Sequence, residues 1–172
     1  MKPIGTRPIY TERLVLRPPC SDDAQELVNC GSLAMSVPEA ERALVNMAQE
    51  AARPFGFHWV ITLGDRAIGR VKGWEVNPYN GFVQLGYDIA PQLRGQGLMT
   101  EAVGAVVRYL LMEAEANRVY CSIREMNIAS RRVCVKNGFR QEGVMRQHYA
   151  RQDGGYDDVC IYGIIRDDMK EE

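Results

Sequence analysis

Residues 82–107 read FVQLGYDIAPQLRGQGLMTEAVGAVV, and this stretch decides the fold. It begins with a strand-like run over residues 82–90 and breaks at Pro91. A helical pattern over residues 97–114 follows, in which apolar residues recur with a period of about 3.6. Those apolar residues are Met99, Ala102, Val103, Val106, Val107, Leu110 and Leu111. The stretch therefore predicts a strand, a tight connection and a long amphipathic helix packed against a sheet.

Two glycines, Gly95 and Gly97, lie in this connection beside Arg94. Glycines at a strand-to-helix junction let the backbone turn tightly and direct successive N–H groups at one point, where the positive end of the helix dipole also acts. That arrangement suits a phosphate or pyrophosphate, and Arg94 adds a fixed cation. A plain tight turn is the alternative interpretation. A dinucleotide-binding fold is disfavoured, because Thr100 stands in place of the third glycine and the preceding strands read as antiparallel.

The rest of the chain predicts a single α/β domain without a linker, spanning residues 1–172. Turn-forming residues separate three consecutive strand-like runs, which is typical of an antiparallel meander. Ser21 is expected to cap the first helix and Pro38 to open the second. Strands are expected over residues 14–17, 57–63, 67–76, 82–90, 118–123, 139–149 and 157–165, and helices over residues 21–30, 38–53, 97–114 and 127–137.

The composition is that of an ordinary globular domain: 46% of the 172 residues are hydrophobic, 25% are charged and the net charge is −1. A near-neutral chain without a dense Lys/Arg run argues against a nucleic-acid partner. Five cysteines at no CxxC spacing and only two histidines argue against a metal site. No window approaches the ~20 apolar residues of a membrane span, so we expect a cytoplasmic protein with reduced thiols and no membrane partner.

Four blocks of the sequence, in order, carry a family resemblance: TERLVLRP (11–18), GYDIAPQLRGQGLMTEAV (86–103), NIASRRVCVKNGFRQEGVMR (127–146) and DDVCIYGIIRDD (157–168). With these blocks the chain resembles the GNAT superfamily of acyl-CoA-dependent N-acetyltransferases, and within it the RimJ/RimL type that acetylates protein N-terminal amines. The resemblance implies a single-domain GNAT-like α/β fold, with a central mixed, mostly antiparallel sheet of about seven strands flanked by about four helices. It also implies acetyl-CoA as the cofactor and a homodimer.

The resemblance further implies a cofactor site on two of these blocks. The loop that opens the long helix would bind the pyrophosphate, and the last strand residues before it would pair with the pantetheine arm through their backbone. Asn127 would contact coenzyme A and Ser130 would give a proton to the leaving sulfur; capping of the short helix is the alternative role for both. At Met99 the family usually has Gly or Ala, so this side chain must point elsewhere. The implied cofactor-binding residues are Ile89, Ala90, Arg94, Gly95, Gln96, Gly97, Leu98, Met99, Thr100, Asn127 and Ser130.

A general base is the least defined part of the predicted mechanism. The family branch often has Glu at the position of Gln84, and an amide cannot usefully accept a proton. We take His148 as the candidate base, beside Ser130 as the candidate acid. Further candidates, each acting through water, are Glu75, Asp88, Tyr87 and His58. An α-amine, with a pKa of about 7.7–8.0, is partly neutral at about pH 7, whereas a lysine or polyamine at about 10.4 needs help.

The predicted function is therefore the direct transfer of an acetyl group from acetyl-CoA to a primary amine, most simply the α-amine of a protein or peptide N-terminus. The resemblance also implies that a backbone N–H near Ile89 or Ala90 stabilises the oxyanion. Two alternatives stay open: a small-amine acetyltransferase with a polyamine or aminoglycoside-like acceptor, and a CoA-binding module without catalysis. A polycationic acceptor would call for an acidic pocket.

Overall fold

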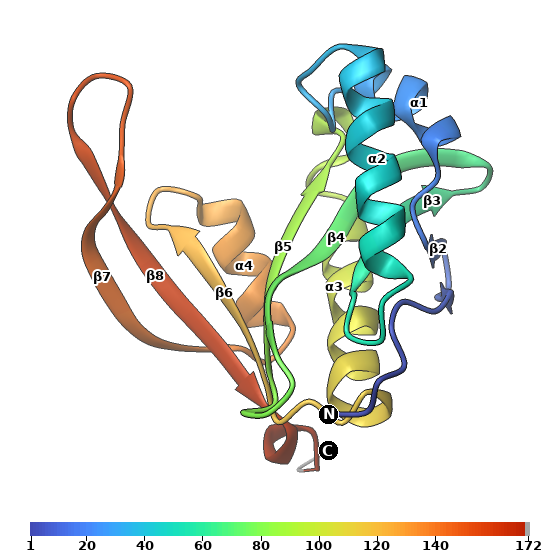
Figure 1. Ribbon diagram of the computed structural model, residues 1–172. Coiled ribbons are helices and arrows are strands. Elements are labelled where there is room, and N and C mark those ends of the chain that lie inside the picture. Colours follow the sequence, from blue (N-terminus) through green and yellow to red (C-terminus); the bar gives the residue numbers. More distant parts are fainter. Residues whose placement is uncertain (171–172) are drawn as a thin grey trace.

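The computed structural model describes residues 1–170, the side chain of Lys170 excepted. In this part of the chain eight strands and four α-helices follow one another (Figure 1). The strands are β1 (Ile9–Tyr10), β2 (Leu14–Arg17), β3 (His58–Leu63), β4 (Arg66–Asn77), β5 (Phe82–Ile89), β6 (Arg118–Arg124), β7 (Arg140–Ala150) and β8 (Tyr156–Ile165). The helices are α1 (Ala24–Asn29), α2 (Val37–Ala51), α3 (Leu98–Arg108) and α4 (Ile128–Lys136). The expected fold class is confirmed, and the strand beyond the expected seven is the two-residue β1.

All eight strands form one sheet in the order β1-β2-β3-β4-β5-β6-β8-β7. Neighbouring strands are antiparallel, including the expected meander of β3, β4 and β5, except that β5 and β6 are parallel. These two strands pair only between residues 82–84 and residues 118–120. Beyond this point β6 diverges from β5, and β8 and β7 follow β6 (Figure 1). The later part of β5 therefore has an open edge in the middle of the sheet.

The alternation of side chains along β3 shows which helices cover each face of the sheet. Trp59 and Ile61 belong to a buried cluster that includes α3, whereas Val60 belongs to a second cluster with α1 and α2. Because successive side chains of a strand point to opposite faces, α3 lies on one face and α1 and α2 on the other. The expected apolar stripe is buried along its whole length, from Met99 to Leu111. Each such Leu or Val side chain stabilises the fold by about 1.5–3 kcal/mol relative to exposure.

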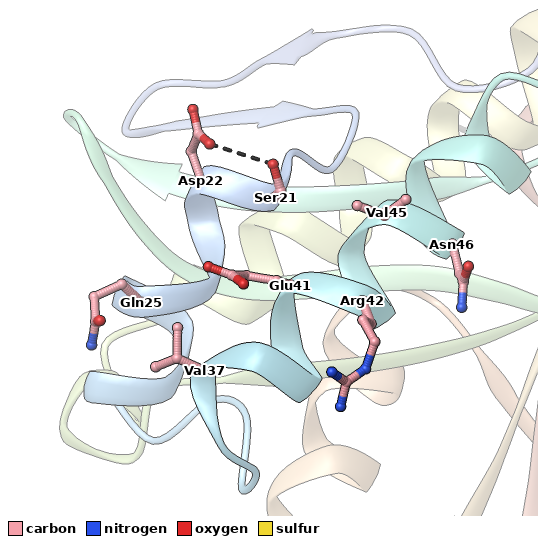
Figure 2. A pocket seen from close by; sticks show the side chains of 8 residues that line it. All are labelled: Ser21, Asp22, Gln25, Val37, Glu41, Arg42, Val45 and Asn46. Carbon is pink, nitrogen blue, oxygen red and sulfur yellow. Dashed lines mark hydrogen bonds between the residues drawn. The ribbon is translucent and has the colours of Figure 1, made fainter.

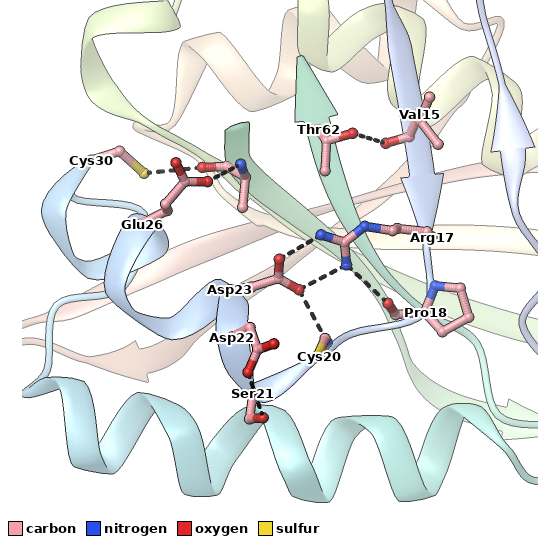
Figure 3. A network of polar contacts seen from close by, with 11 residues as sticks. Val15, Arg17, Pro18, Cys20, Ser21, Asp22, Asp23, Glu26, Cys30 and Thr62 are labelled. Atoms are coloured by element: carbon pink, nitrogen blue, oxygen red, sulfur yellow. Dashed lines mark hydrogen bonds and ion pairs between the residues drawn. The ribbon is translucent and has the colours of Figure 1, made fainter. Parts of the chain in front are cut away.

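The segment after β2 differs from the helix start that the sequence predicts. A 3-10 turn, Ser21–Asp23, comes first, and α1 begins at Ala24. The carboxylate of Asp23 accepts hydrogen bonds from the Cys20 N–H at 3.0 Å and from Arg17 at 2.6 and 2.9 Å (Figure 3). The expectation that Ser21 caps this helix is therefore wrong. A buried carboxylate needs such partners, and Asp23 is only 6% exposed.

No helix within residues 1–170 is both long and apolar enough to cross a bilayer. Over the same residues, no three His, Cys, Asp or Glu side chains are grouped so that they could hold a metal ion. The five cysteines are free thiols, and Cys20 alone among them is exposed.

His58 on β3 is buried, and its Nδ1 atom has no hydrogen-bond partner, while its Nε2 atom lies 3.1 Å from a carboxylate oxygen of Glu50. Burial lowers the pKa of His58 below its usual value, an effect that Glu50 opposes and Lys72 reinforces. Below about pH 6.5 the unfolded chain therefore binds a proton here that the folded chain does not. We expect the free energy of unfolding to fall as the pH drops from about 7 to about 5, and to fall less in His58→Gln. Urea titrations across this pH range measure the unfolding free energy of the wild type and of His58→Gln. If that free energy falls equally with pH in the two proteins, the lowered pKa of His58 is contradicted.

Candidate active site

The open edge of β5 forms one wall of a cavity of about 450 Å³. The turn after β5 and the start of α3 continue this wall, and α4 forms another. The cavity is lined by Tyr87, Asp88, Ile89, Leu93, Arg94, Gly95, Gly97, Leu98, Met99, Thr100, Asn127, Ala129, Ser130, Arg132, Val133 and Lys136. The structure thus brings together all the expected cofactor-binding residues except Ala90 and Gln96.

A second hollow, of about 550 Å³, lies between α1 and α2 (Figure 2). It contains none of the expected site residues. Two carboxylates, Asp22 and Glu41, line it together with one cation, Arg42. Because this charge pattern does not favour a diphosphate, we assign the candidate active site to the cavity beside β5.

The loop before α3 adopts a conformation that glycine permits best. Gly95 and Gly97 have φ angles of 76° and 78°, in the left-handed region. A Cβ atom at Gly95 would meet nothing within 4 Å, so the backbone conformation, and not lack of space, calls for glycine there. Within residues 1–170, no protein group accepts a hydrogen bond from the N–H of Gly95, Gln96 or Gly97. Together with the unpaired N–H groups in the first turn of α3, these donors fit a diphosphate.

Arg13 and Glu101 hold this loop from outside the cavity. Arg13 donates from Nε to Glu101 Oε2 at 2.7 Å and from Nη1 to the carbonyl oxygen of Gln96 at 3.1 Å. Glu101 also accepts hydrogen bonds from the Thr11 hydroxyl at 2.6 Å and from the Arg13 N–H at 2.9 Å. The carbonyl between the two glycines is thereby held toward Arg13, and the orientation of the neighbouring N–H groups is fixed with it.

Arg13→Ala should therefore weaken the binding of coenzyme A by about tenfold, since one hydrogen bond from a charged group contributes about 1.5–3 kcal/mol to holding the loop. Calorimetric titration with coenzyme A measures this loss. Arg66→Ala, at an exposed position at the start of β4, removes the same charge and should leave the affinity unchanged. Equal affinities of the two variants would contradict the role of Arg13.

The N-terminus of α4 brings Ser130 against β5. Asn127 caps α4, because its Oδ1 accepts a hydrogen bond from the Ser130 N–H at 3.2 Å. The Ser130 hydroxyl takes no part in the cap and donates to the Tyr87 hydroxyl at 2.9 Å. Tyr87 donates to the carbonyl oxygen of Ser130 at 3.1 Å and lies 3.5 Å from Sγ of Cys134. The capping role that was open for both residues is thus confirmed for Asn127 alone.

The charged residues that line the cavity are mostly cations. Arg132 and Lys136 lie one turn apart on α4, and Arg94 faces the cavity from the glycine loop. The single carboxylate among the described lining residues, Asp88, is paired with Arg70 at 2.7 Å. The resulting positive charge suits a ligand with several phosphates.

At the end of β5, Ile89 and Ala90, two of the expected cofactor-binding residues, differ in the direction of their backbone N–H groups. Ala90 is fully buried, and its N–H donates to the carbonyl oxygen of Ile68 on β4 at 2.8 Å. This N–H is therefore not free for the pantetheine arm. Successive residues of a strand direct their N–H groups to opposite edges, so the N–H of Ile89 points to the edge that β6 has left.

Several expected site residues lie away from the cavity. The side-chain amide of Gln96 donates to the carbonyl oxygen of Gln92 at 3.3 Å. His148, the candidate base, is exposed on β7 and does not line the cavity. Glu75 and His58 are not among the lining residues either, so Asp88 and Tyr87 are the base candidates that the structure places there.

Sequence reasoning missed three residues that shape this cavity: Arg13, Glu101 and Arg132. It considered Tyr87 only as a base and not as the partner of Ser130. A signal was present for the first two, because they lie in the first and second of the four resemblance blocks. Arg132 precedes Lys136 by one helical turn, which would have placed both cations on one side of the predicted helix.

Residues 13–140 match the sequence model of the family described as acetyltransferase (GNAT) domain. The chain therefore belongs to this family, and it is an acetyl-CoA-dependent acetyltransferase. It is 28% identical over 171 residues to the uncharacterized N-acetyltransferase YoaA of Bacillus subtilis (strain 168), and the match covers 92% of this chain and 96% of that protein. It is 26% identical over 143 residues to the ribosomal-protein-serine acetyltransferase of Escherichia coli (strain K12), with 83% and 79% covered. The solved structure of RimL, an alpha-N-protein acetyltransferase, with coenzyme A has the same fold, with a TM-score of 0.82 at 23% identity over 92% of this chain and 98% of that chain.

Proposed function

We propose that this acetyltransferase transfers the acetyl group directly to the α-amine of a protein or peptide N-terminus. The observation that carries this proposal is that no free carboxylate lines the described cavity, because Asp88 is held by Arg70 and by the hydroxyl of Ser32. Without a strong base, an acceptor with a pKa of about 7.7–8.0 is favoured over an amine at about 10.4.

The names of two relatives support a protein acceptor. One is the Escherichia coli ribosomal-protein-serine acetyltransferase. The other is the [ribosomal protein uS5]-alanine N-acetyltransferase of the same organism, 30% identical over 84 residues that cover 49% of this chain and 43% of that protein. A peptide that begins with serine or alanine is therefore the first acceptor to test.

Hydrogen-bond donors at the cavity would serve three parts of the donor substrate: the diphosphate, the thioester carbonyl oxygen and the sulfur. The N–H groups of residues 95–97 and of the first turn of α3 would hold the diphosphate, with Arg94 beside them. The N–H of Ile89 would stabilise the carbonyl oxygen, and the Ser130 hydroxyl would donate to the leaving sulfur. Acetyl-CoA, when bound, supplies an activated acyl carbon and a leaving group whose thiol has a pKa of about 8.5. The role of His148 stays a prediction that no contact supports.

Three acceptors distinguish the proposed function from its alternatives: a lysine-free peptide with a free N-terminal serine, the same peptide with a blocked N-terminus and one internal lysine, and spermidine. Thiol release and mass spectrometry of the products are the readouts. We expect one acetyl group on the first peptide only. Preferred acetylation of spermidine would identify a small-amine enzyme, and coenzyme A binding without thiol release would identify a binding module.

We also infer a homodimer, as the resemblance implies. β7 is an edge strand of the sheet, and its eleven residues are all exposed. Such an edge can pair with the same strand of a second chain. Light scattering should then give about twice the chain mass of 19.4 kDa, whereas the mass of one chain would contradict the dimer.

A further inference from the structure

Tyr87 on β5 makes three polar contacts with α4. Its hydroxyl accepts a hydrogen bond from Ser130 Oγ at 2.9 Å and donates one to the Ser130 carbonyl oxygen at 3.1 Å. The Sγ of Cys134, one turn further along α4, lies 3.5 Å from the same hydroxyl. Tyr87 and Ser130 both line the cavity. Tyr87 therefore reaches from one wall of the cavity to the residue that we propose to serve the sulfur on the other.

The phenol proton of Tyr87 is donated to the carbonyl oxygen of Ser130, and the Oγ of Ser130 and the Sγ of Cys134 are further acceptors within its reach. When the Ser130 hydroxyl donates its hydrogen bond to Tyr87, the phenol donates its own hydrogen bond to the Ser130 carbonyl oxygen. When Ser130 turns its proton into the cavity, the phenol can turn its own proton to Oγ across the same 2.9 Å. The bond between the two hydroxyls is kept in both arrangements, and in the second it polarises the Ser130 hydroxyl and makes it a better donor.

We propose that Tyr87 is a positioning residue that keeps the Ser130 hydroxyl directed at the sulfur atom that leaves during acetyl transfer. This inference rests on the proposed function. Tyr87 acts through Ser130: it fixes the side chain by its hydrogen bond and supplies the second donor when Ser130 turns to the sulfur.

The transfer balances without ionising either hydroxyl. The amine nitrogen forms the new C–N bond and loses one proton to water, while the C–S bond breaks with its electron pair on sulfur, which takes one proton from water. Ser130 stabilises the charge on sulfur by donating a hydrogen bond, and Tyr87 donates to Ser130. Burial raises the pKa of Tyr87 well above its usual value, and Cys121 and Cys134 raise it further, so the phenol stays protonated over the working pH range.

Tyr87→Phe removes the hydroxyl and keeps the ring, so it tests the proposal directly. With the peptide that carries a free N-terminal serine, we expect turnover to fall roughly tenfold, a part of what a positioned donor contributes. The Kd for coenzyme A, measured by calorimetry, should change less than about twofold.

A second readout needs no acceptor. The thiolate absorbance of bound coenzyme A, followed against pH, should give a thiol pKa below the free value of about 8.5 in the wild type. Tyr87→Phe and Ser130→Ala should both return this pKa toward the free value. Ser130→Ala leaves the bond from Tyr87 to the carbonyl oxygen in place, so it also serves if the first variant fails to fold.

Two comparisons separate this role from a merely structural one. The double variant Tyr87→Phe/Ser130→Ala should be no slower than Ser130→Ala alone, because the two hydroxyls act as one unit. Tyr109→Phe is the matched control: it removes a buried hydroxyl that donates to the Gly5 carbonyl oxygen at 2.6 Å, away from the cavity lining. It should lower the melting temperature and leave turnover and the thiol pKa unchanged.

Unchanged turnover and thiol pKa in Tyr87→Phe would overturn the inference. So would a double variant whose turnover is about a further tenfold below that of Ser130→Ala alone. An equal loss of turnover in Tyr109→Phe would also overturn it. Each of these results leaves the proposed function standing. If the wild type binds no coenzyme A, or binds it and acetylates no N-terminus, the proposed function fails and the role of Tyr87 fails with it.

Discussion

Gly97→Val should weaken the binding of coenzyme A by about 100-fold. Gly97 has a φ of 78°, a region that a β-branched residue enters at a cost of at least about 1–2 kcal/mol. The loop can relieve this strain only by turning its backbone, and the N–H groups of residues 95–97 then no longer converge. Loss of two hydrogen bonds to a charged diphosphate, at about 1.5–3 kcal/mol each, corresponds to a 100-fold change or more. Calorimetric titration measures this directly.

Gly64→Val is the matched control for this variant. Gly64 lies in the turn between β3 and β4, has a φ of 58°, and a Cβ atom there would meet nothing within 4 Å. Both variants should lose about 1–2 kcal/mol or more of unfolding free energy, because the same backbone strain is introduced. Only Gly97→Val should lose affinity for coenzyme A, and Gly64→Val should keep it. Similar affinities in the two variants would show that the glycine loop does not hold the diphosphate.

Ser130→Ala should lower turnover by about 100-fold while the KM for acetyl-CoA changes less than about twofold. Ser130 lines the cavity and its hydroxyl is bonded to Tyr87, whereas the cap of α4 is formed by Asn127 through the backbone N–H of Ser130. The substitution therefore removes a donor that acts mainly in the transition state and leaves the helix start in place. Steady-state kinetics with the serine peptide measure both constants.

Ser36→Ala is the opposite control, because this serine belongs to a helix start remote from the cavity lining. Its hydroxyl donates to Glu39 at 2.6 Å at the N-terminus of α2, and loss of such a cap costs about 1 kcal/mol. We expect Ser36→Ala to lose stability and keep its turnover, and Ser130→Ala to do the reverse. Unchanged turnover in Ser130→Ala would return this residue to a structural role.

Local patterns were enough to predict the order and type of the elements, except for the two-residue β1 and the 3-10 turn before α1. The alternating run before Pro91 is β5, and the apolar stripe after Gly97 is α3 followed by a π-helical turn, Tyr109–Glu113. Hydrophobic periodicity within one element reports which face is buried, and the buried face of α3 was predicted correctly. The strand-to-helix junction was also evident, because left-handed glycines and a helix N-terminus are local features.

Contacts between distant parts of the chain could not be predicted in this way. Ser130 and Tyr87 are 43 residues apart, and Arg13 and Glu101 are 88 apart, so no spacing rule joins them. Their meeting depends on how the sheet orders its strands and on where α4 packs. His148 was chosen for its residue type, and the sequence contains no sign that β6 and β8 separate its strand from β5.

The most direct test of the central claim is hydrogen–deuterium exchange of the wild-type chain with and without coenzyme A. If the cavity beside β5 holds the cofactor, the amides of residues 94–100 and 127–136 should exchange more slowly in its presence, and those lining the hollow between α1 and α2 should not change. Calorimetric binding with protection confined to the hollow, or with none in residues 94–100, would contradict the assignment of the site.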